Sequence, residues 1–454
     1  MVILWFRRDL RLEDNHALYR ALKSGYDVLP IFIYDSDITD KLKENDHRLK
    51  FISQAIKNIN IELAKKKKKV YTFKGKPYNV IEKLIKKFNI KEVYLNKDYE
   101  PYARDRDDEI KVLCKKNNVI YKSFKDHVIF EEDEIVKKDG TPYVVYTPYS
   151  KKWIEKYKSN SIETYKSEKY ISHIVDSSTI DNYDYNIKFE KNIIQPVNYS
   201  FNNHLIDNYE DTRNYPSLDS TSRIGVNLRF GTVSTRNIVK KSSIRSNNTY
   251  LKELIWREFF IQILWHFPYT INKSFKDKYE RVEWRNNMED FKSWCDGKTG
   301  YPIVDAGMNQ LNKTGFIHNR LRMVVGSFLC KHLLIDWRLG EKYFADKLFD
   351  YEQASNVGNW QWVAGCGVDA APYFRIFNPI LQGEKFDKEG LYVKKWVPEL
   401  EKVPNKLLHK PWEMELNYQQ AIKTIIGKDY PQPIVIHEKA RASALEAFQS
   451  LKKN

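Results

Sequence analysis

The hydrophobic positions of the first 128 residues form two alternating patterns. Short, nearly continuous apolar runs predict buried strands at Val2–Phe6, Leu29–Tyr34, Val70–Phe73, Val93–Leu95 and Val119–Tyr121. Between these runs, apolar residues recur at spacings of three and four, which predicts amphipathic helices. Regular alternation of strand and helix predicts an α/β domain with a doubly wound parallel sheet.

The rest of the chain is patterned differently. Residues from about 129 to 198 are rich in Tyr, Ser, Asn, Lys and Asp and carry few helix or strand signals, so we interpret them as a connector. From about residue 199, apolar residues return to helical spacing at Tyr250–Phe267, Pro302–Asn312, Asn319–Ile335 and Lys342–Phe349. The predicted organisation is an α/β domain over residues 1–128, a connector over 129–198 and an all-α domain over 199–454.

One segment of the all-α part, Asp350–Pro379, lacks the apolar stripe of a plain core helix. Polar side chains alternate there with large aromatic ones. Gly358, Gly365 and Gly367 suggest close approach of the backbone to something flat. The segment therefore predicts a site for a buried, polar ring system.

The charge of the chain allows two interpretations. Its 76 Lys and Arg against 60 Asp and Glu give a net charge of +16. This excess favours a polyanionic partner, nucleic acid before an acidic membrane surface. A lysine-rich solvated surface, which the run Lys65–Lys69 suggests, explains the same number. Charge alone does not decide between them.

Several classes of function lack their sequence signals. No window approaches the roughly 18 uncharged apolar residues of a membrane span, and the short apolar run before Arg7 reads as a first strand rather than a signal peptide. The four cysteines have no CxxC spacing, and GxSxG, HExxH, GxGxxG and GxxxxGK[ST] motifs are missing. His318, before Asn319, is better interpreted as a helix-entry residue than as a base. We therefore expect no metal and no disulfide framework.

Three polar features remain, and each also has a plain structural explanation. Residues 219–223 precede an apolar run, so they form either an ordinary N-cap or a phosphate-binding helix start. Glu253 and Arg257 are spaced as an ordinary helical ion pair. Arg322 stands in an apolar helix and needs a partner, for which Asp350 is the natural candidate.

Four segments resemble motifs of the photolyase/cryptochrome family. They are WFRRDLRLEDNHAL at residues 5–18, ELIWREFF at 253–260, TGFIHNRLRM at 314–323 and ASNVGNWQWVAGCGVDAAPYFRIFNP at 354–379. The resemblance runs from Trp5 to about Pro433 and is nearest to a class I-type cyclobutane pyrimidine dimer photolyase. It implies an N-terminal antenna domain, an interdomain connector and a helical FAD-binding catalytic domain.

The resemblance implies a flavin site formed by Tyr209, Thr221, Ser222, Arg223, Gly225, Arg322, Asp350, Glu352 and Asn356. Two positions depart from the family. Gly225 follows Ile224 where the TSRLSP loop has Leu-Ser, which implies a weaker grip on phosphate, and Glu352 replaces the more common Asp. Asn356 matches the residue that faces the flavin N5, where plant-type photoreceptors carry Asp. An amide cannot relay a proton, which suits an enzyme that holds reduced, anionic flavin.

The same resemblance assigns three further sets of roles. Electron transfer falls to Trp360, Trp337 and Trp284, which would otherwise be interpreted as core tryptophans. Catalytic contacts with the dimer fall to Glu253, Trp256, Asn319, Met323 and Trp362, and phosphate contacts to Arg213, Arg320 and Arg375. Relatives that repair the (6-4) lesion carry histidines in the region of Asn319 and Met323. The Asn and Met therefore favour the cyclobutane dimer.

The resemblance thus implies light-driven repair of UV-damaged DNA, single- or double-stranded, by electron transfer from reduced FAD to a dimer. The flipping of the damaged nucleotide out of the duplex is a general property of such enzymes. We expect a monomeric, cytoplasmic protein without a membrane partner, associated with the nucleoid if the source is bacterial. The alternative is a cryptochrome-type blue-light receptor without repair activity. A dark FAD oxidoreductase would need a nicotinamide-binding motif that is missing.

A second, antenna chromophore is implied as well, and its type stays open between a deazaflavin, a flavin and a folate. The segment YEPYARDRD, Tyr99–Asp107, aligns with the family's antenna contacts. Folate-binding relatives often show Asn-Glu where this chain has Tyr102 and Ala103. The sequence Glu-Pro-Tyr at residues 100–102 is closer to that of members that bind a deazaflavin or a flavin.

Overall fold

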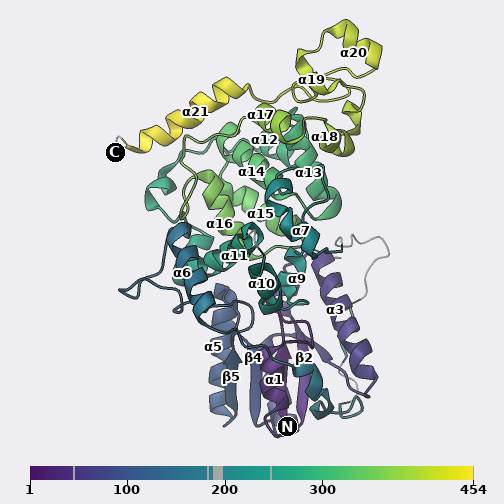
Figure 1. Cartoon of the computed structure of the whole chain (residues 1–454), viewed down its shortest axis with the longest axis vertical. Helices are drawn as coiled ribbons and strands as arrows, with labels where there is room; N and C mark the ends of the chain where they lie inside the picture. The colour runs from purple at the N-terminus through teal and green to yellow at the C-terminus, as the bar shows by residue number, and fades with distance from the viewer. Residues whose placement is uncertain (44–45, 181–183, 188–197, 246–247, 453–454) are drawn as a thin grey trace. The chain divides into compact units, whose positions relative to one another are not determined.

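The computed structural model describes residues 1–43, 46–180, 184–187, 198–245 and 248–452 (Figure 1). The chain forms two compact units. Met1–Tyr199 and Arg223–His266 make the first unit, and Ser200–Ser222 and Phe267–Asn454 make the second. The domain boundaries that the sequence predicted, near residues 128 and 198, stay predictions.

The first unit contains a five-stranded parallel sheet in the order β3-β2-β1-β4-β5. Its strands are β1 (Val2–Phe6), β2 (Val28–Asp35), β3 (Tyr71–Gly75), β4 (Glu92–Asn96) and β5 (Ile120–Phe124). The α/β fold and all five strands are confirmed, with bounds shifted by three residues or fewer. The strand order reverses between β1 and β4, where doubly wound sheets bind ligands at the carboxyl ends of their strands.

Helices cover the sheet and explain its apolar runs. They are α1 (His16–Leu22), α2 (Ser36–Thr39), α3 (His47–Ala64), α4 (Pro77–Phe88) and α5 (Pro101–Lys116). All five residues of β1 are buried, since successive side chains point to opposite faces and both faces are covered. Ile3 and Trp5 share a core with residues of α4 and α5. Both helices begin at a proline, whose fixed φ suits the first helical position.

The predicted connector is more regular than its composition suggested. It contains α6 (Tyr146–Ser159) and η1 (Ser167–His173), while residues 181–183 and 188–197 lie outside the described part. Helix α6 buries Tyr146, Tyr149 and Trp153, which stand three and four residues apart. These aromatic rings supply the helical stripe that a count of polar residues concealed.

Buried ion pairs hold Arg223–His266 to the α/β part of the first unit. This segment contains α9 (Gly225–Phe230), α10 (Thr235–Ser243) and α11 (Thr249–His266). Arg236 of α10 pairs with Asp14 at 3.0 Å and with Asp126 at 2.8 Å. Arg11 pairs with Asp126 at 2.7 Å. Burial alone would raise the pKa of Asp126, but the two guanidinium charges outweigh it and hold that pKa well below its usual range.

The second unit is helical throughout its described residues. Its elements are α7 (Asn203–Asp207), α8 (Tyr209–Thr212), η2 (Pro268–Ile271), η3 (Asp277–Arg281), α12 (Met288–Cys295), α13 (Pro302–Thr314), α14 (Asn319–Ser327), η4 (Phe328–His332), α15 (Trp337–Lys347), α16 (Gln353–Ala364), α17 (Pro379–Phe386), α18 (Leu391–Trp396), η5 (Pro398–Leu400), α19 (Asn405–Leu408), η6 (Pro411–Glu413), α20 (Leu416–Ile422), α21 (His437–Gln449) and η7 (Ser450–Lys452). One apolar core joins α12 to α16.

Two predicted helices of the second unit are corrected. The stretch Asn319–Ile335 is α14 followed by a π-helical turn, η4, rather than one helix. The spacing of apolar residues does not distinguish an α-helix from a π-helical turn, because apolar side chains are buried in both. The stretch Lys342–Phe349 is the end of a longer helix, α15, which starts at Trp337 and stops before Leu348. Asp336 caps its start by accepting a hydrogen bond from the Arg338 N–H.

The prediction that Asp350–Pro379 contains no ordinary core helix is also corrected. Residues Gln353–Ala364 form α16, and Gly365, at a φ of +91°, ends it. The buried positions of α16 include Asn356 and Gln361 beside Trp360 and Val363. The helix has a buried side, but amide side chains occupy part of it, so the apolar residues alone do not show a helical period.

Some features are missing from the described part of the chain. No helix there has the length and apolar character to cross a membrane. Nor do the described His, Cys, Asp and Glu residues gather in a group of three or more that would hold a metal ion. All four cysteines are buried and free.

The helix α21 packs on η4 through a pair of histidines, and this predicts acid sensitivity. His332 Nε2 and His437 Nδ1 are 2.9 Å apart. Burial, with the charge of His437, lowers the pKa of His332 to about 3. Because the unfolded side chain titrates near about 6.5, the unfolded chain binds a proton that the folded one excludes. The free energy of unfolding should therefore fall as pH drops below about 6.5, by at most about 1.4 kcal/mol per pH unit.

His332→Gln should flatten this pH dependence, because glutamine keeps a hydrogen-bonding group without titrating. Urea unfolding midpoints measured at several pH values from 7.5 downward would check it, with His204→Gln at an exposed site as the control. A variant that loses stability in acid as steeply as the wild type would contradict the assignment to His332.

Candidate functional site

The predicted ion pair between Arg322 and Asp350 is present in the second unit. Arg322 Nη2 donates to both carboxylate oxygens of Asp350, at 3.1 and 2.9 Å, and Arg322 Nε donates to the Ile317 carbonyl at 3.0 Å. His318 caps α14, because its Nδ1 accepts from the Arg320 N–H at 3.1 Å. Its interpretation as a helix-entry residue is confirmed. The pair joins the start of α14 to the residues just before α16.

Asn356 on α16 is held by Glu341 on α15. The Asn356 amide nitrogen donates to the Glu341 carbonyl at 3.0 Å and to Glu341 Oε1 at 2.9 Å. Burial raises the pKa of Glu341, partly offset by this hydrogen bond. Since both N–H groups of the amide are used, Asn356 presents its carbonyl oxygen as an acceptor. The sequence missed Glu341, because an acidic residue on a helix near other charges carries no distinguishing signal.

The three predicted electron-transfer tryptophans lie in or against the core of the second unit. Trp360 and Trp337 are members of the core, and Trp284 is half-buried at its edge. The Trp360 ring meets the Phe344 ring edge-on, with centroids 5.0 Å apart. Within the described residues the Trp337 ring N–H is buried without a hydrogen-bond partner, which is unusual for a buried indole. These positions suit their predicted role without testing it.

Three predicted dimer-facing residues lie on two packed helices, α14 and α16. Asn319 is exposed and Met323 half-buried, one turn apart on α14, and Trp362 is half-buried on α16. Glu352 is buried just before α16, and the Ser355 hydroxyl donates to its carboxylate at 3.3 Å. The Glu352 carbonyl accepts from the Asn356 N–H at 2.8 Å. The backbone of Glu352 thus supports α16 whichever acid stands there.

Two of the three predicted phosphate-binding arginines affect each other electrostatically. Burial, and the charge of Arg213, lower the pKa of Arg320. Arg320 donates to Asn214 Oδ1 at 2.6 Å, and its guanidinium lies 4.2 Å from the centre of the Phe386 ring. Arg375 is exposed in the loop after α16. Neighbouring arginines that repel one another suit an anionic partner.

The residues predicted to bind the flavin phosphates lie on both sides of a boundary between the units along the chain. Tyr209, Thr221 and Ser222 belong to the second unit, and Arg223 and Gly225 to the first. Arg223 has a φ of +54°, an uncommon backbone conformation for a residue with a side chain. Gly225 begins α9, which has no side-chain cap. Of the two alternatives for residues 219–223, the ordinary N-cap is wrong, because Ile224 occupies the N-cap position, whereas the phosphate-binding helix start stays a prediction.

Helix α11 of the first unit carries Glu253 and Trp256, both half-buried. They are three residues apart and so lie on one side of the helix. The Trp256 ring is stacked on the ring of Tyr146, with centroids 3.6 Å apart and planes inclined by 6°. Arg257 donates to the His127 carbonyl at 3.1 Å. The carboxyl and indole thus stand side by side on a helix that packs against α6 of the connector and against α10.

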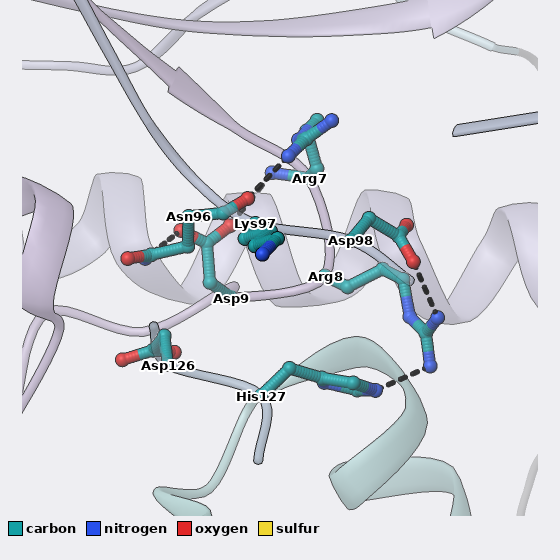
Figure 2. A pocket seen from close by; sticks show the side chains of 8 residues that line it. All are labelled: Arg7, Arg8, Asp9, Asn96, Lys97, Asp98, Asp126 and His127. Carbon is teal, nitrogen blue, oxygen red and sulfur yellow. Dashed lines mark hydrogen bonds and ion pairs between the residues drawn. The ribbon is translucent and has the colours of Figure 1, made fainter. Parts of the chain in front are cut away.

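The point where the strand order reverses is filled by charged side chains. Figure 2 shows residues that follow β1, β4 and β5 gathered around a cavity of about 10 Å³. Arg8 donates to Asp98 at 2.9 Å, and Asn96 donates to Asp9 at 2.6 Å. Burial would raise the pKa of Asp98, but the charges of Arg8 and Arg7 hold it well below its usual range. A cavity of this size holds about one water molecule.

The predicted antenna segment, Tyr99–Asp107, is engaged in contacts within the first unit. The Tyr102 hydroxyl donates to Asp35 at the end of β2, at 2.7 Å. Arg104 donates to the Trp265 carbonyl at 2.9 Å. Arg106 lies over the Trp5 ring, 4.9 Å from its centre. The part that this segment takes in binding a second chromophore stays a prediction.

Comparisons with known proteins agree with these motifs. Residues 250–450 match the family model described as the FAD binding domain of DNA photolyase, and residues 2–167 match the DNA photolyase model. The chain is 36% identical to a deoxyribodipyrimidine photo-lyase from Alkalihalophilus pseudofirmus, over 98% of this chain and 97% of the relative. The chain belongs to the DNA photolyase and cryptochrome family.

Solved structures of the photolyase family share the fold. A class III photolyase from Agrobacterium tumefaciens is 35% identical with a TM-score of 0.89, covering 100% of this chain and 98% of that one. A cryptochrome from Synechocystis is 28% identical with a TM-score of 0.85, covering 98% and 99%. The resemblance to the family is confirmed, whereas the class I-type assignment stays a prediction.

The residues present fit the FAD that the matched family model implies. The buried carbonyl oxygen of Asn356 is an acceptor that suits the N–H of a reduced flavin ring. The pair Arg322–Asp350 adds a fixed positive charge on α14 and its counter-charge just before α16. Buried polar groups normally have a hydrogen-bond partner, and a bound flavin would provide one. The role of each residue toward FAD stays a prediction.

Proposed function

We propose that this chain is a deoxyribodipyrimidine photo-lyase, an enzyme that splits cyclobutane pyrimidine dimers in UV-damaged DNA. The observation that carries the proposal is the pair Glu253 and Trp256, a carboxyl and a partly exposed indole side by side on α11. The carboxyl can form a hydrogen bond with a pyrimidine ring while the indole beside it stacks on that ring. The full-length similarity to curated photo-lyases supports the same reaction class.

Bound FAD in its reduced state would supply the electron that light drives to the dimer. Within the site, Glu253 would hold a hydrogen bond to the dimer that strengthens as negative charge develops there. By resemblance to the family, Trp256 and Trp362 would each pack on the lesion. Asn319 and Met323 would complete the pocket with an amide and an apolar thioether.

The basic side chains have a separate task. Arg213, Arg320 and Arg375 would contact phosphates, which gives affinity that falls with salt and depends little on sequence. Exposed Phe374 stands next to Arg375. The net charge of +16 is thereby explained in part by DNA rather than by solvation alone.

The test is blue-light repair of an oligonucleotide with one thymine dimer by the purified, photoreduced protein. We expect Glu253→Ala to lower the number of dimers repaired per absorbed photon several-fold. The lost contact is a hydrogen bond to a charged species, which is worth about 1.5–3 kcal/mol. Glu253→Gln, which keeps a hydrogen-bonding side chain of the same length, should retain more activity than the alanine variant.

Two outcomes would contradict different parts of the proposal. Wild-type protein that binds FAD and dimer DNA but leaves dimers intact in light would rule out the photo-lyase. It would favour the cryptochrome-type receptor, the class to which the Synechocystis relative belongs. Equal repair by Glu253→Ala and wild type would remove only the role of that carboxyl.

We also propose a second, antenna chromophore, which is a deazaflavin, a flavin or a folate. We expect it to contact the segment Tyr99–Asp107, which the family resemblance aligns with antenna contacts. The first unit also has a cavity of about 270 Å³, whose lining includes Phe130, Lys125 and Lys156. The absorption spectrum of protein purified from its natural source distinguishes the three chromophore types.

A further inference from the structure

We propose that Tyr146 is a positioning residue that orients Trp256 for recognition of the dimer, and that α6 braces α11 for this purpose. The inference rests on the proposed function and deepens it. It gives the connector a part in choosing damaged over undamaged DNA. All the contacts that carry it lie within the first unit.

The stack between Tyr146 and Trp256 is the tightest ring contact that Trp256 makes. The two centroids are 3.6 Å apart at 6°. The rings of Phe259 and Phe260 lie at 5.6 and 5.5 Å, the first of them edge-on. A parallel contact at this distance covers one face of the indole and limits its rotation.

The position of Tyr146 is itself determined by α11. Its hydroxyl donates to the Lys252 carbonyl at 2.8 Å, one turn before Trp256. Its ring also meets Phe259 edge-on, at 5.9 Å. Tyr146 is buried, so its hydrogen bond and its ring contacts together hold the side chain in one conformation.

A second contact fastens α6 and the connector to α11. Glu258 is buried, and its carboxylate accepts from the N–H groups of Ile129 and Phe130 at 2.7 and 2.9 Å. The Trp153 ring N–H donates to the same carboxylate at 2.7 Å. Helix α6 is therefore attached to α11 at Tyr146 and again at Trp153, two turns later. Such double attachment prevents α6 from sliding along α11.

The geometry has a consequence for selectivity. Tyr146 occupies one face of Trp256, so a pyrimidine must use the remaining exposed part of the ring. Stacking of a base on an aromatic side chain depends on the plane of that side chain. The predicted phosphate contacts through Arg213, Arg320 and Arg375 lie on other elements. Loss of the stack should therefore weaken binding of the dimer and leave binding of undamaged DNA unchanged.

The experiment measures dissociation constants in the dark, with the FAD-containing protein and two single-stranded oligonucleotides. One carries a single thymine dimer and the other has the same sequence undamaged. Tyr146→Leu should weaken dimer binding about tenfold, a part of the free energy of one stacked base. Tyr146→Phe keeps the ring and should bind within about twofold of wild type, a change of less than half a kcal/mol.

The matched control is Tyr94→Leu on β4. Tyr94 is buried, as Tyr146 is, and stacks on Phe124, with centroids 5.9 Å apart at 7°, so this variant removes a stack away from Trp256 and from α6. It should keep the preference for the dimer. Thermal midpoints of all variants show how much stability each change removes. Tyr146→Met, which refills the volume with a non-planar side chain, replaces the leucine variant if that one does not fold.

Three results would overturn the inference. They are an unchanged dimer preference in Tyr146→Leu or Tyr146→Met, an equal loss in Tyr94→Leu, or an equal loss in Tyr146→Phe. The last result would assign the effect to the hydroxyl. Wild-type protein without any preference for the dimer would instead refute the proposed function, so the two failures are distinguishable.

Discussion

Gly340→Ala is expected to displace the Trp360 ring and lower the free energy of unfolding by about 2–3 kcal/mol, as overpacked cores do. A Cβ at this position would lie 2.2 and 2.4 Å from two atoms of the Trp360 ring and 2.6 Å from Leu329. Gly340 is inside α15, where alanine normally stabilises a helix by about 1 kcal/mol. The clash reverses that sign, because ring and helix are both held in the core.

Chemical unfolding followed by circular dichroism would measure this change, with Gly326→Ala as the control. A Cβ at Gly326 of α14 approaches the same Trp360 ring at 3.6 and 3.8 Å, which is ordinary contact, and Val363 at 3.1 Å. That variant should stay within about 1 kcal/mol of wild type, since Val363 has to move by only a few tenths of an ångström. Equal stability of Gly340→Ala and wild type would show that α15 and α16 separate more easily than the packing indicates.

Trp360→Phe is expected to slow photoreduction of bound FAD by at least about 100-fold, equivalent to roughly 3 kcal/mol of added barrier. A phenyl ring fills most of the indole volume but is far harder to oxidise, so it cannot pass an electron onward. Trp360 is buried in the core and packs edge-on to Phe344, so a phenylalanine there should be tolerated structurally.

Illumination of the oxidised protein with a thiol reductant, followed by the flavin absorption, would measure the rate. Trp412→Phe provides the control, because Trp412 is half-buried on η6 and contacts Tyr301 at 5.3 Å. It should reduce at the wild-type rate. Chemically reduced Trp360→Phe should still repair dimers, since the resemblance to the family assigns the tryptophans to reduction of the flavin rather than to the repair step. Unchanged photoreduction in Trp360→Phe would assign the electron path to other residues.

The two predictions address the same feature, the contact between α15 and α16. Gly340 admits the Trp360 ring, and Glu341, the next residue, orients the Asn356 amide. One turn of α15 therefore positions both Trp360, the predicted first electron donor, and Asn356, the predicted neighbour of the flavin. A displaced ring in Gly340→Ala should accordingly slow photoreduction as well as lower stability.

Periodic features were predictable from the sequence. Each strand of the first unit is a run of apolar residues, because a strand covered on both faces buries every side chain. The apolar spacing also located α11 and α13 to within two residues, and the start of α14. The helix α16 escaped this reasoning, because Asn356 and Gln361 take inward positions that a core helix fills with apolar residues.

Part of the candidate site was predictable for a different reason. The pair Arg322–Asp350 follows from the cost of leaving a guanidinium unpaired among apolar side chains. Family motifs named further residues, and they place Glu253 beside Trp256 because both stand on one helix. Their roles toward FAD and DNA stay predictions.

By itself the sequence determined the α/β and all-α parts, the helix that carries Glu253 and Trp256, and the family to which the chain belongs. Only the tertiary structure decided that Tyr146 stacks on Trp256, that Glu341 holds Asn356, and that charged side chains fill the reversal point of the sheet. The physical reason is range. Periodicity and capping act over a few neighbouring residues, whereas these contacts join residues whose separation in the chain no local pattern encodes.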